Sequence, residues 1–472
     1  MSPKMTRREL LQTGALGFGS LALAALDAGE GGQASRIGPH FAPQSKSVIF
    51  MMQNGGPSQM DLFDPKPELT KFDGKIHAEK VEMFQPGSEG NKLLASPLTF
   101  RRYGECGMEM AEIVPHLGAC ADDICLVRSA YNYHNNHTES RVAINTGKIF
   151  QGRPALGSWV SYALGSENRN LPDYIVLRDP DGYNTSGTLL WQNGFMPASY
   201  RGTEVSTRGT PVLNLTRAKP LPPGVQGDNL DFLAKLNRRH QQQFSYESAL
   251  EARIENYELA ARMQLAADEV FDLSSEPESV QQMYGLNDET TRGYGLRCLM
   301  ARRLVESGVR FVQILPPVKP QNQPWDAHGN VKDQNEQICA RCDRGSGALI
   351  TDLKQRGLLD STIVVWTGEF GRLPVSQNGS GRDHNRNAFS LILAGGGFRP
   401  GHMHGETDEV GYRAVTDPVS VADLHATLLH QLGLDHNRLT YVHHGRPETL
   451  TDKVVSGARV IPELFDQPAR CA

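Results

Sequence analysis

Residues 47–57 read SVIFMMQNGGP, and this stretch sets the frame for the rest of the chain. Its first six residues are almost entirely apolar and predict a buried strand. The following Gln-Asn-Gly-Gly-Pro run is a cluster of turn-forming residues that ends the strand. A buried strand that leads into a glycine-rich loop is where open α/β sheets place their functional sites. We therefore expect the loop after residue 52 to border a site.

Similar strand-like runs recur downstream and alternate with helical patterns. This alternation predicts an α/β fold, a doubly wound and mostly parallel sheet with helices on both faces. We expect strands at 124–129, 174–177, 309–315, 362–367 and 389–394, and helices at 109–121, 158–164, 295–306, 337–357 and 421–432. A further helix is expected to begin near Ser140, at the end of a polar run at 133–141.

One large domain accounts for most of the 472 residues, because α/β domains with insertions run long. We assign residues 47–450 to this domain and residues 451–472 to a C-terminal tail. Within the domain, residues 179–290 form a loop-rich and helical insertion or cover. The segment 229–273 is charged and has apolar residues at helical spacing, so it forms the helical part.

Composition excludes some function classes. The net charge is −5 and charges of both signs are spread along the chain, unlike the concentrated basic surface of a nucleic-acid-binding protein. The seven cysteines are mostly expected to be reduced and buried. Cys339 and Cys342 have the C-x-x-C spacing of a redox or zinc half-site, although their surroundings read as an ordinary helix. Cys120 and Cys125 could form a disulfide, which spacing alone does not establish.

The N-terminus carries the marks of an export signal. Arg7 and Arg8 precede a modest apolar stretch from Ala15 to Leu26. A twin arginine followed by such a stretch predicts a Tat signal, so residues 1–34 are assigned to signal peptide and linker. The apolar run is too short to span a bilayer. We expect a periplasmic or extracellular protein without a stable membrane span, and Tat export of folded cargo agrees with a metal acquired before export.

Potential metal ligands gather just after the predicted strands. In a doubly wound sheet the carboxyl ends of parallel strands meet at one rim, so distant segments can combine there. Carboxylates and imidazoles together suit one divalent cation, namely zinc, calcium, manganese or magnesium. The candidates are Asn54, Asp61 and Asp64 after the first strand, His134, His137 and Glu139 after the second, then Asp326, His328, Glu369, Asp383 and His384.

Each candidate also has a purely structural interpretation. Asp326 and His328 could lie on the surface, and Asp383 with His384 could serve a turn. Glu369 could form an ion pair with Arg372. Asp61 and Asp64, which follow the first strand, could cap helices. The metal hypothesis therefore depends on the joint placement of these residues at strand ends.

Three segments resemble motifs of the alkaline phosphatase/sulfatase superfamily. Residues 364–372 (VVWTGEFGR) resemble the step at which a strand delivers metal-binding acidic residues. Residues 421–433 (VADLHATLLHQLG) resemble a late sulfatase helix, and residues 138–148 (TESRVAINTGK) resemble the sulfatase signature that ends in Thr-Gly. Short segments at 54–58, 325–330, 371–372 and 381–384 resemble a Tat-exported, sulfatase-like bacterial branch of unknown function.

The resemblance implies roles for particular residues. Counting back from Gly147 places His137 at the nucleophile position, with Thr138 adjacent and Arg141 available to stabilise an anionic group. It implies a metal site built from Asp326, His328 and His384. Three further residues complete the implied metal-binding set: Glu369, Asp383 and Asn54.

Departures from the superfamily pattern separate two hypotheses about function. No cysteine occupies the nucleophile position, Asn54 replaces the usual aspartate, and Phe370 replaces the usual histidine or asparagine after the acid. The first hypothesis is a metallo-hydrolase acting on a sulfate or phosphate ester of a small molecule or polysaccharide. The second is a catalytically degenerate secreted binding or scaffold protein on the same fold.

Overall fold

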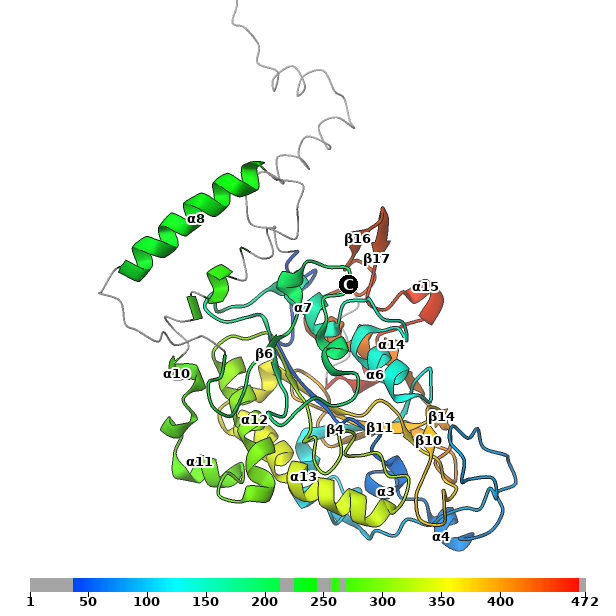
Figure 1. Ribbon diagram of the computed structural model, residues 1–472. Helices are drawn as coiled ribbons and strands as arrows, with labels where there is room; N and C mark the ends of the chain where they lie inside the picture. The colour runs from blue at the N-terminus through cyan, green and yellow to red at the C-terminus, as the bar shows by residue number, and fades with distance from the viewer. Residues whose placement is uncertain are drawn as a thin grey trace, which may run out of the picture. The chain divides into compact units, whose positions relative to one another are not determined.

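A nine-stranded sheet forms the centre of the molecule (Figure 1). All of its strand pairs are parallel except the two made by β11, which runs antiparallel to both neighbours. The predicted fold class is therefore confirmed. The strand order is β12 (His402–His404), β4 (Ile124–Tyr131), β11 (Phe389–Ala394), β8 (Thr362–Thr367), β1 (Ser47–Met52), β7 (Phe311–Ile314), β5 (Tyr174–Leu177) and β6 (Thr203–Glu204), with β15 (Val419–Ser420) also paired to β4.

The computed structural model describes residues 37–212, 225–243 and 268–466, together with residue 254, residues 257–260 and residues 262–263. Residues 39–472 form one compact unit. The predicted export signal and much of the predicted helical segment 229–273 lie outside the described residues, as does Cys471. Among the helices that the structure describes, none is long and apolar enough to cross a membrane.

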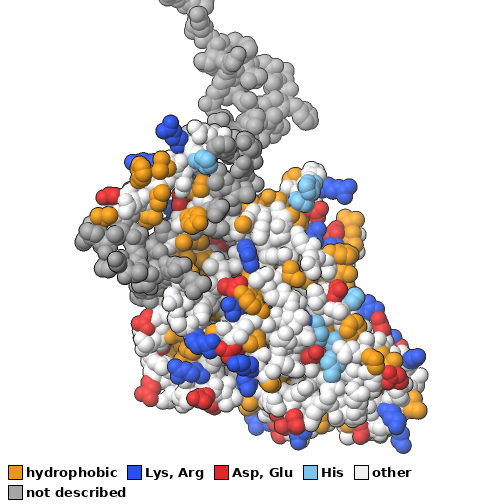
Figure 2. All heavy atoms as spheres, viewed as in Figure 1, with side chains coloured by type: hydrophobic (Ala, Val, Ile, Leu, Met, Phe, Trp, Pro, Cys, Tyr) orange, Lys and Arg blue, Asp and Glu red, His pale blue; other side chains and the backbone are white. Residues whose placement is uncertain are grey.

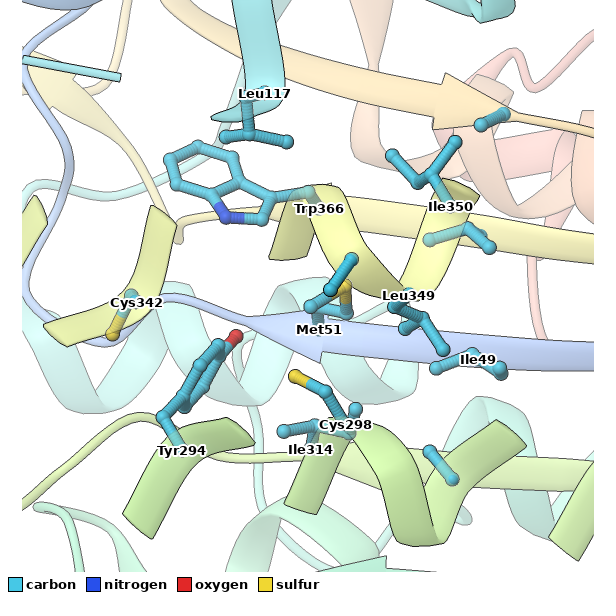
Figure 3. Packing of buried hydrophobic residues seen from close by; sticks show 14 of the residues in the cluster. Ile49, Met51, Leu117, Tyr294, Cys298, Ile314, Cys342, Leu349, Ile350 and Trp366 are labelled. Carbon is cyan, nitrogen blue, oxygen red and sulfur yellow. The ribbon is translucent and has the colours of Figure 1, made fainter. Parts of the chain in front are cut away.

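Helices cover both faces of the sheet, as the sequence predicts (Figure 1). Strand β1 is fully buried and its side chains alternate between two apolar clusters. Ile49 and Met51 face α12 (Glu289–Glu306) and α13 (Val331–Gln355), and Figure 3 shows this packing. Val48 and Phe50 belong to the opposite cluster, which includes α7 (Leu156–Leu164) and α14 (Val421–Gln431). Burial of both faces explains the nearly continuous apolar sequence of this strand.

The helix predicted at 109–121 is wrong. Residues 108–111 form strand β3 (Met108–Ala111), which pairs antiparallel with β2 (Phe100–Tyr103). Met108 and Met110 are buried and Glu109 between them is exposed, which is the period of two of a strand with one face toward solvent; Ala111, the last residue, is buried as well. Only α5 (Pro115–Gly118) is helical in this region, and Pro115 stands at its first position.

Capping residues explain why three helices begin earlier than their apolar patterns indicate. Helix α13 begins six residues before the predicted start because the Asn330 side chain accepts a hydrogen bond from Asp333 N. Asp288 caps α12 in the same way. Helix α6 (His137–Thr146) begins at His137, with Asn136 accepting from Thr138 N.

The remaining elements are short except α8 (Val225–Gln243). Residues 179–212 contain β6 and two 3-10 turns, η2 (Gly187–Trp191) and η3 (Ala198–Tyr200), and α8 follows as a largely exposed helix. The other helices are α3 (Gln59–Leu62), α4 (Pro67–Lys71), α10 (Asp268–Phe271), α11 (Glu278–Met283) and α15 (Lys453–Ser456); the other strands are β9 (Gly371–Arg372), β10 (His384–Asn385), β13 (Glu406–Thr407), β14 (Ala414–Thr416), β16 (Tyr441–His443) and β17 (Arg446–Glu448).

The described cysteines are all free, and five of the six are buried. Cys120 and Cys125 therefore do not form the disulfide that their spacing permits. Cys339 and Cys342 lie in the buried face of α13, where burial raises the pKa of both thiols well above the ordinary value. A thiol that resists ionisation is a poor redox or metal-binding group, so the C-x-x-C pair is part of the core.

Candidate metal centre

The site forms at the rim where the parallel strands end. Strands β1, β4, β7 and β8 all run toward this rim, so the loops that follow them meet there. Strand β11 runs the other way and therefore begins at the same rim. For this reason a histidine that precedes β11 joins residues that follow the other strands.

Four side chains from three separate segments converge at this rim: His137, Asp326, His328 and His384. One potential ligand atom of each lies within 4.8 Å of all the others. Asp326 Oδ1 is 3.2 Å from His137 Nε2, 2.9 Å from His328 Nε2 and 3.3 Å from His384 Nε2. His328 Nε2 and His384 Nε2 are 3.0 Å apart. The structure thus brings together the predicted trio of Asp326, His328 and His384, and adds His137 to it.

Each of the three imidazoles is held through its other ring nitrogen. His137 Nδ1 donates to Glu369 Oε1 at 2.6 Å, and His384 Nδ1 donates to the Asn135 carbonyl at 2.7 Å. His328 Nδ1 donates to Gln377 Oε1 at 2.5 Å. The Gln377 amide is oriented because its Nε2 donates to the Pro86 carbonyl. All three rings therefore carry their proton on Nδ1 and turn Nε2 toward the cluster.

Arg372 supports the carboxylate at the centre of the cluster. Its Nη2 donates to Asp326 Oδ1 at 2.7 Å, and its other donors bond the carbonyls of Gly56 and Arg382. Burial alone would raise the pKa of Asp326, but the charge of Arg372 holds the pKa well below its ordinary value. Asp326 is therefore a carboxylate across the physiological pH range.

Burial keeps one ring of the cluster neutral. His384 is 0% exposed, and burial lowers its pKa to about 3 although the negative charge of Asp326 opposes the shift. Its ring lies between Phe84, at a centroid distance of 5.0 Å, and Phe370, at 4.6 Å. A neutral imidazole is the form that binds a metal.

Glu369 is a second buried carboxylate, one step removed from the cluster. It accepts hydrogen bonds from Gly55 N at 3.0 and 3.1 Å as well as from His137. Burial would raise its pKa, but the His137 hydrogen bond and the charge of Arg141 lower it below the ordinary value. Glu369 thus contacts the Nδ1 side of His137, away from the cluster, and orients the ring. The cluster itself consists of the three histidines and Asp326.

The loop after β1 must approach the Asp326 loop very closely. Gly55 has a φ of +120°, and a Cβ at this position would lie 2.6 Å from Asp326 N. Trp325 N donates to the Asn54 carbonyl in the same contact. Only glycine satisfies both the backbone angle and the lack of space. The glycine-rich loop that the sequence singled out is therefore a structural support for Asp326.

The four groups could together hold one metal ion. Four ligands at about 2.0–2.1 Å from a tetrahedral ion lie roughly 3.3 Å from one another. The three Asp326–histidine distances fall near this value. Histidines that bind a metal through Nε2 commonly donate Nδ1–H to an oxygen, as all three do here. His328 and Asp326 are 23% and 14% exposed, so the centre has an approach from solvent.

Besides Glu369, four predicted site residues lie outside the cluster. Asp383 accepts from Phe84 N and Gln85 N, and its carboxylate holds that segment. The amide of Asn54 is fully buried, and neither of its polar atoms has a hydrogen-bond partner among the described residues. Thr138 is half-buried in the first turn of α6, next to His137.

Arg141 is the fourth, and its guanidinium faces protein groups. It is fully buried and donates to the carbonyls of His137 and Thr185 and to Gln323 Oε1. Its charge also lies 3.5 Å from Glu369. Arg141 therefore joins α6 to the loop that carries Asp326, which differs from the predicted contact with an anionic substrate group.

Asp61 and Asp64, the aspartates that follow the first strand, form structural ion pairs. Asp61 forms an ion pair with buried Arg382 at 2.7 Å, and Asp64 pairs with Lys66. Sequence reasoning missed Gln377 and Asn135 as supports. The structural alternative offered for Glu369, an ion pair with Arg372, is wrong, because Arg372 pairs with Asp326. Neither missed residue has a local motif, because one acts through a side-chain amide and the other through its backbone carbonyl.

The drawn face of the molecule carries charges of both signs. Figure 2 shows lysine, arginine, aspartate and glutamate side chains mixed across this face, with a small group of histidines among them.

Comparison with known proteins places the chain in a family. No curated protein sequence matches it. Similar solved structures include the PsFucS1 sulfatase from Pseudoalteromonas sp. (13% identity, 88% of this chain and 71% of that chain, TM-score 0.35) and the phosphonate monoester hydrolase SpPMH from Silicibacter pomeroyi (14%, 73% and 72%, TM-score 0.33). A protein in the alkaline phosphatase superfamily from Vibrio parahaemolyticus is also similar (11%, 84% and 68%, TM-score 0.33). Residues 45–465 match the family described as "Protein of unknown function (DUF1501)", and the chain belongs to that family.

Proposed function

We propose that the protein is an exported, metal-dependent hydrolase of a sulfate or phosphate ester. The observation that carries the proposal is the arrangement of three imidazoles around Asp326, each held by an oxygen acceptor on Nδ1 and directing Nε2 inward. Buried polar groups arranged in this way have no evident role in stability, because three nitrogen lone pairs face one carboxylate. They suit a bound cation.

The proposed roles follow from position. His137, Asp326, His328 and His384 hold the ion, and zinc is the cation that three imidazoles and one carboxylate favour. When bound, such an ion polarises an ester oxygen and promotes deprotonation of water. His137 is then engaged through both ring nitrogens, so it is not the attacking group that its sequence position suggests. The attacking oxygen comes from water or from the Thr138 hydroxyl beside it.

The N-terminus of α6 contributes to anion binding. His137 is the first residue of this ten-residue helix, so the N-terminus of the helix lies beside the cluster. A helix N-terminus stabilises an anionic group. This placement supports a sulfate or phosphate group as the part of the substrate that meets the metal. The organic part would belong to a small molecule or a polysaccharide.

Metal content and turnover test the proposal. Purified mature protein is expected to bind about one equivalent of zinc, measured by plasma mass spectrometry, and to hydrolyse aryl sulfate or aryl phosphate esters. His384→Ala should abolish both properties. His402→Ala, on the edge strand β12, is the control and should retain both. Wild type that holds zinc but turns over no ester in the panel would favour the binding or scaffold alternative, and absence of zinc would refute the metal centre.

Export has its own test. Replacing Arg7 and Arg8 with lysines should leave the precursor in the cytoplasm, because Tat recognition depends on the arginine pair. Cell fractionation with detection of the mature chain measures the outcome. Normal export of the lysine variant would contradict a Tat signal and leave the hydrolase proposal untouched.

A further inference from the structure

Residues 84–87 are pinned beside the metal centre by two side chains. Phe84 N and Gln85 N donate to Asp383 Oδ2 at 2.6 and 2.8 Å. Gln377 Nε2 donates to the Pro86 carbonyl at 2.8 Å. Gln377 is the residue that also holds His328, and Asp383 directly precedes His384. The position of this segment is therefore coupled to the position of two proposed ligands.

Phe84 occupies the solvent side of His384. The two rings stack at a centroid distance of 5.0 Å with an interplanar angle of 20°. Phe370, on another side of His384, is 0% exposed, whereas Phe84 is 38% exposed. One aromatic ring is thus part of the core, and the other presents apolar surface to solvent in contact with a proposed ligand.

Shielding of His384 from solvent does not by itself explain why Phe84 is held in this position. A single exposed apolar side chain is common on protein surfaces and by itself needs no explanation. Here, however, the backbone that carries the ring is fixed by the buried carboxylate of Asp383. The result is an ordered aromatic ring beside the place where an ester would meet the ion.

We propose that Phe84 forms a subsite for the organic group of the ester, and that it accepts a ring with a flat apolar face. This inference rests on the proposed function, because it assumes an ester held at the metal. An aryl ring or the C–H face of a saturated ring, as in a sugar, offers the same shared chemistry. Either would pack on Phe84 while the anionic group lies against the cluster.

Equilibrium binding of phosphonates to the zinc-loaded protein tests the subsite without relying on turnover. Titration calorimetry compares phenylphosphonate, cyclohexylphosphonate and methylphosphonate. Wild type should bind at least one of the two ring compounds about 3- to 10-fold more tightly than methylphosphonate, the range expected for one aromatic contact. The tighter of the two identifies the aryl or the saturated-ring source.

Phe84→Ala should remove this preference, and Phe84→Tyr should restore it. Phe72→Ala is the matched control, since Phe72 is 40% exposed but caps α4 and makes none of the cluster contacts described above. Zinc content and thermal unfolding of every variant are measured in parallel. A preference that survives in Phe84→Ala would overturn the subsite. Loss of zinc in that variant would do the same, because Phe84 would then only position His384.

The two proposals can fail separately. Wild type that binds methylphosphonate and the ring compounds equally would refute the subsite but leave the ester site intact. Zinc-loaded wild type that binds none of the three phosphonates would refute both the subsite and the ester site.

Discussion

Replacing Glu369 with glutamine is expected to weaken zinc binding by 10- to 100-fold. The carboxylate is fully buried and accepts from His137 Nδ1 at 2.6 Å and from Gly55 N at 3.0 and 3.1 Å. Glutamine has nearly the same shape but one acceptor oxygen, so its NH₂ group must face one of these donors. His137 then loses the charged partner that fixes its tautomer. Loss of such a partner typically costs 10- to 100-fold in metal affinity, or about 1.4–2.7 kcal/mol.

The same substitution should lower the stability of the zinc-free protein by about 1.5–3 kcal/mol, the usual contribution of a hydrogen bond to a charged group. Zinc affinity is measured by competition with a chromogenic chelator, and stability by urea unfolding after chelation. Glu82→Gln is the control, because Glu82 is half-exposed in its ion pair with Arg386 and should change neither value appreciably. Zinc affinity of Glu369→Gln within threefold of wild type would refute the assigned role of Glu369.

Three further substitutions test other parts of the structure. Burial raises the pKa of Asp343 to about 7, although two backbone N–H groups donate to its carboxyl group. The contribution of this carboxyl group to the free energy of unfolding is therefore complete below about pH 4. It is lost as pH rises through 7, and the loss amounts to up to about 4 kcal/mol. Asp343→Asn should flatten this decline in urea unfolding measured from pH 5 to 8, and an unchanged slope would contradict it. Gly55→Ala should displace the Asp326 loop and abolish stoichiometric zinc binding, whereas retained zinc would show that the loop can adjust. Thr138→Ala should reduce ester turnover at least 100-fold if its hydroxyl attacks, and near-normal turnover would assign the attack to water.

The strands of the sheet could be predicted because each is a short apolar run bounded by turn residues. Residues 47–52, 362–367 and 389–394 match β1, β8 and β11 residue for residue. Helix starts were predicted less well, since apolar periodicity marks where a helix becomes buried and a cap marks where it begins. The six residues between Asn330 and the expected start of α13 are mostly polar and illustrate the difference.

Part of the site could also be predicted, namely that Asp326, His328 and His384 would meet. Strand ends specify which loops share a rim, and these loops carry the residues. Which way each side chain turns depends on partners distant in sequence. Asp383 and His384 are neighbours, yet one holds residues 84–85 and the other faces the cluster. A sequence pattern cannot distinguish the two residues, because the directions in which their side chains point are set only by the contacts of the folded chain.

The reversed direction of β11 makes the polypeptide between β8 and β11 an exchangeable module. Residues 368–388 leave the sheet and return to it at the same rim, and β9 and β10 close them into a hairpin. This one segment carries Glu369, Arg372, Gln377, Asp383 and His384. No part of it crosses a face of the sheet, so a homologous segment could replace it without disturbing the helices that cover those faces. Substitution, insertion or recombination in this hairpin can therefore change the chemistry of the rim while the scaffold stays as it is.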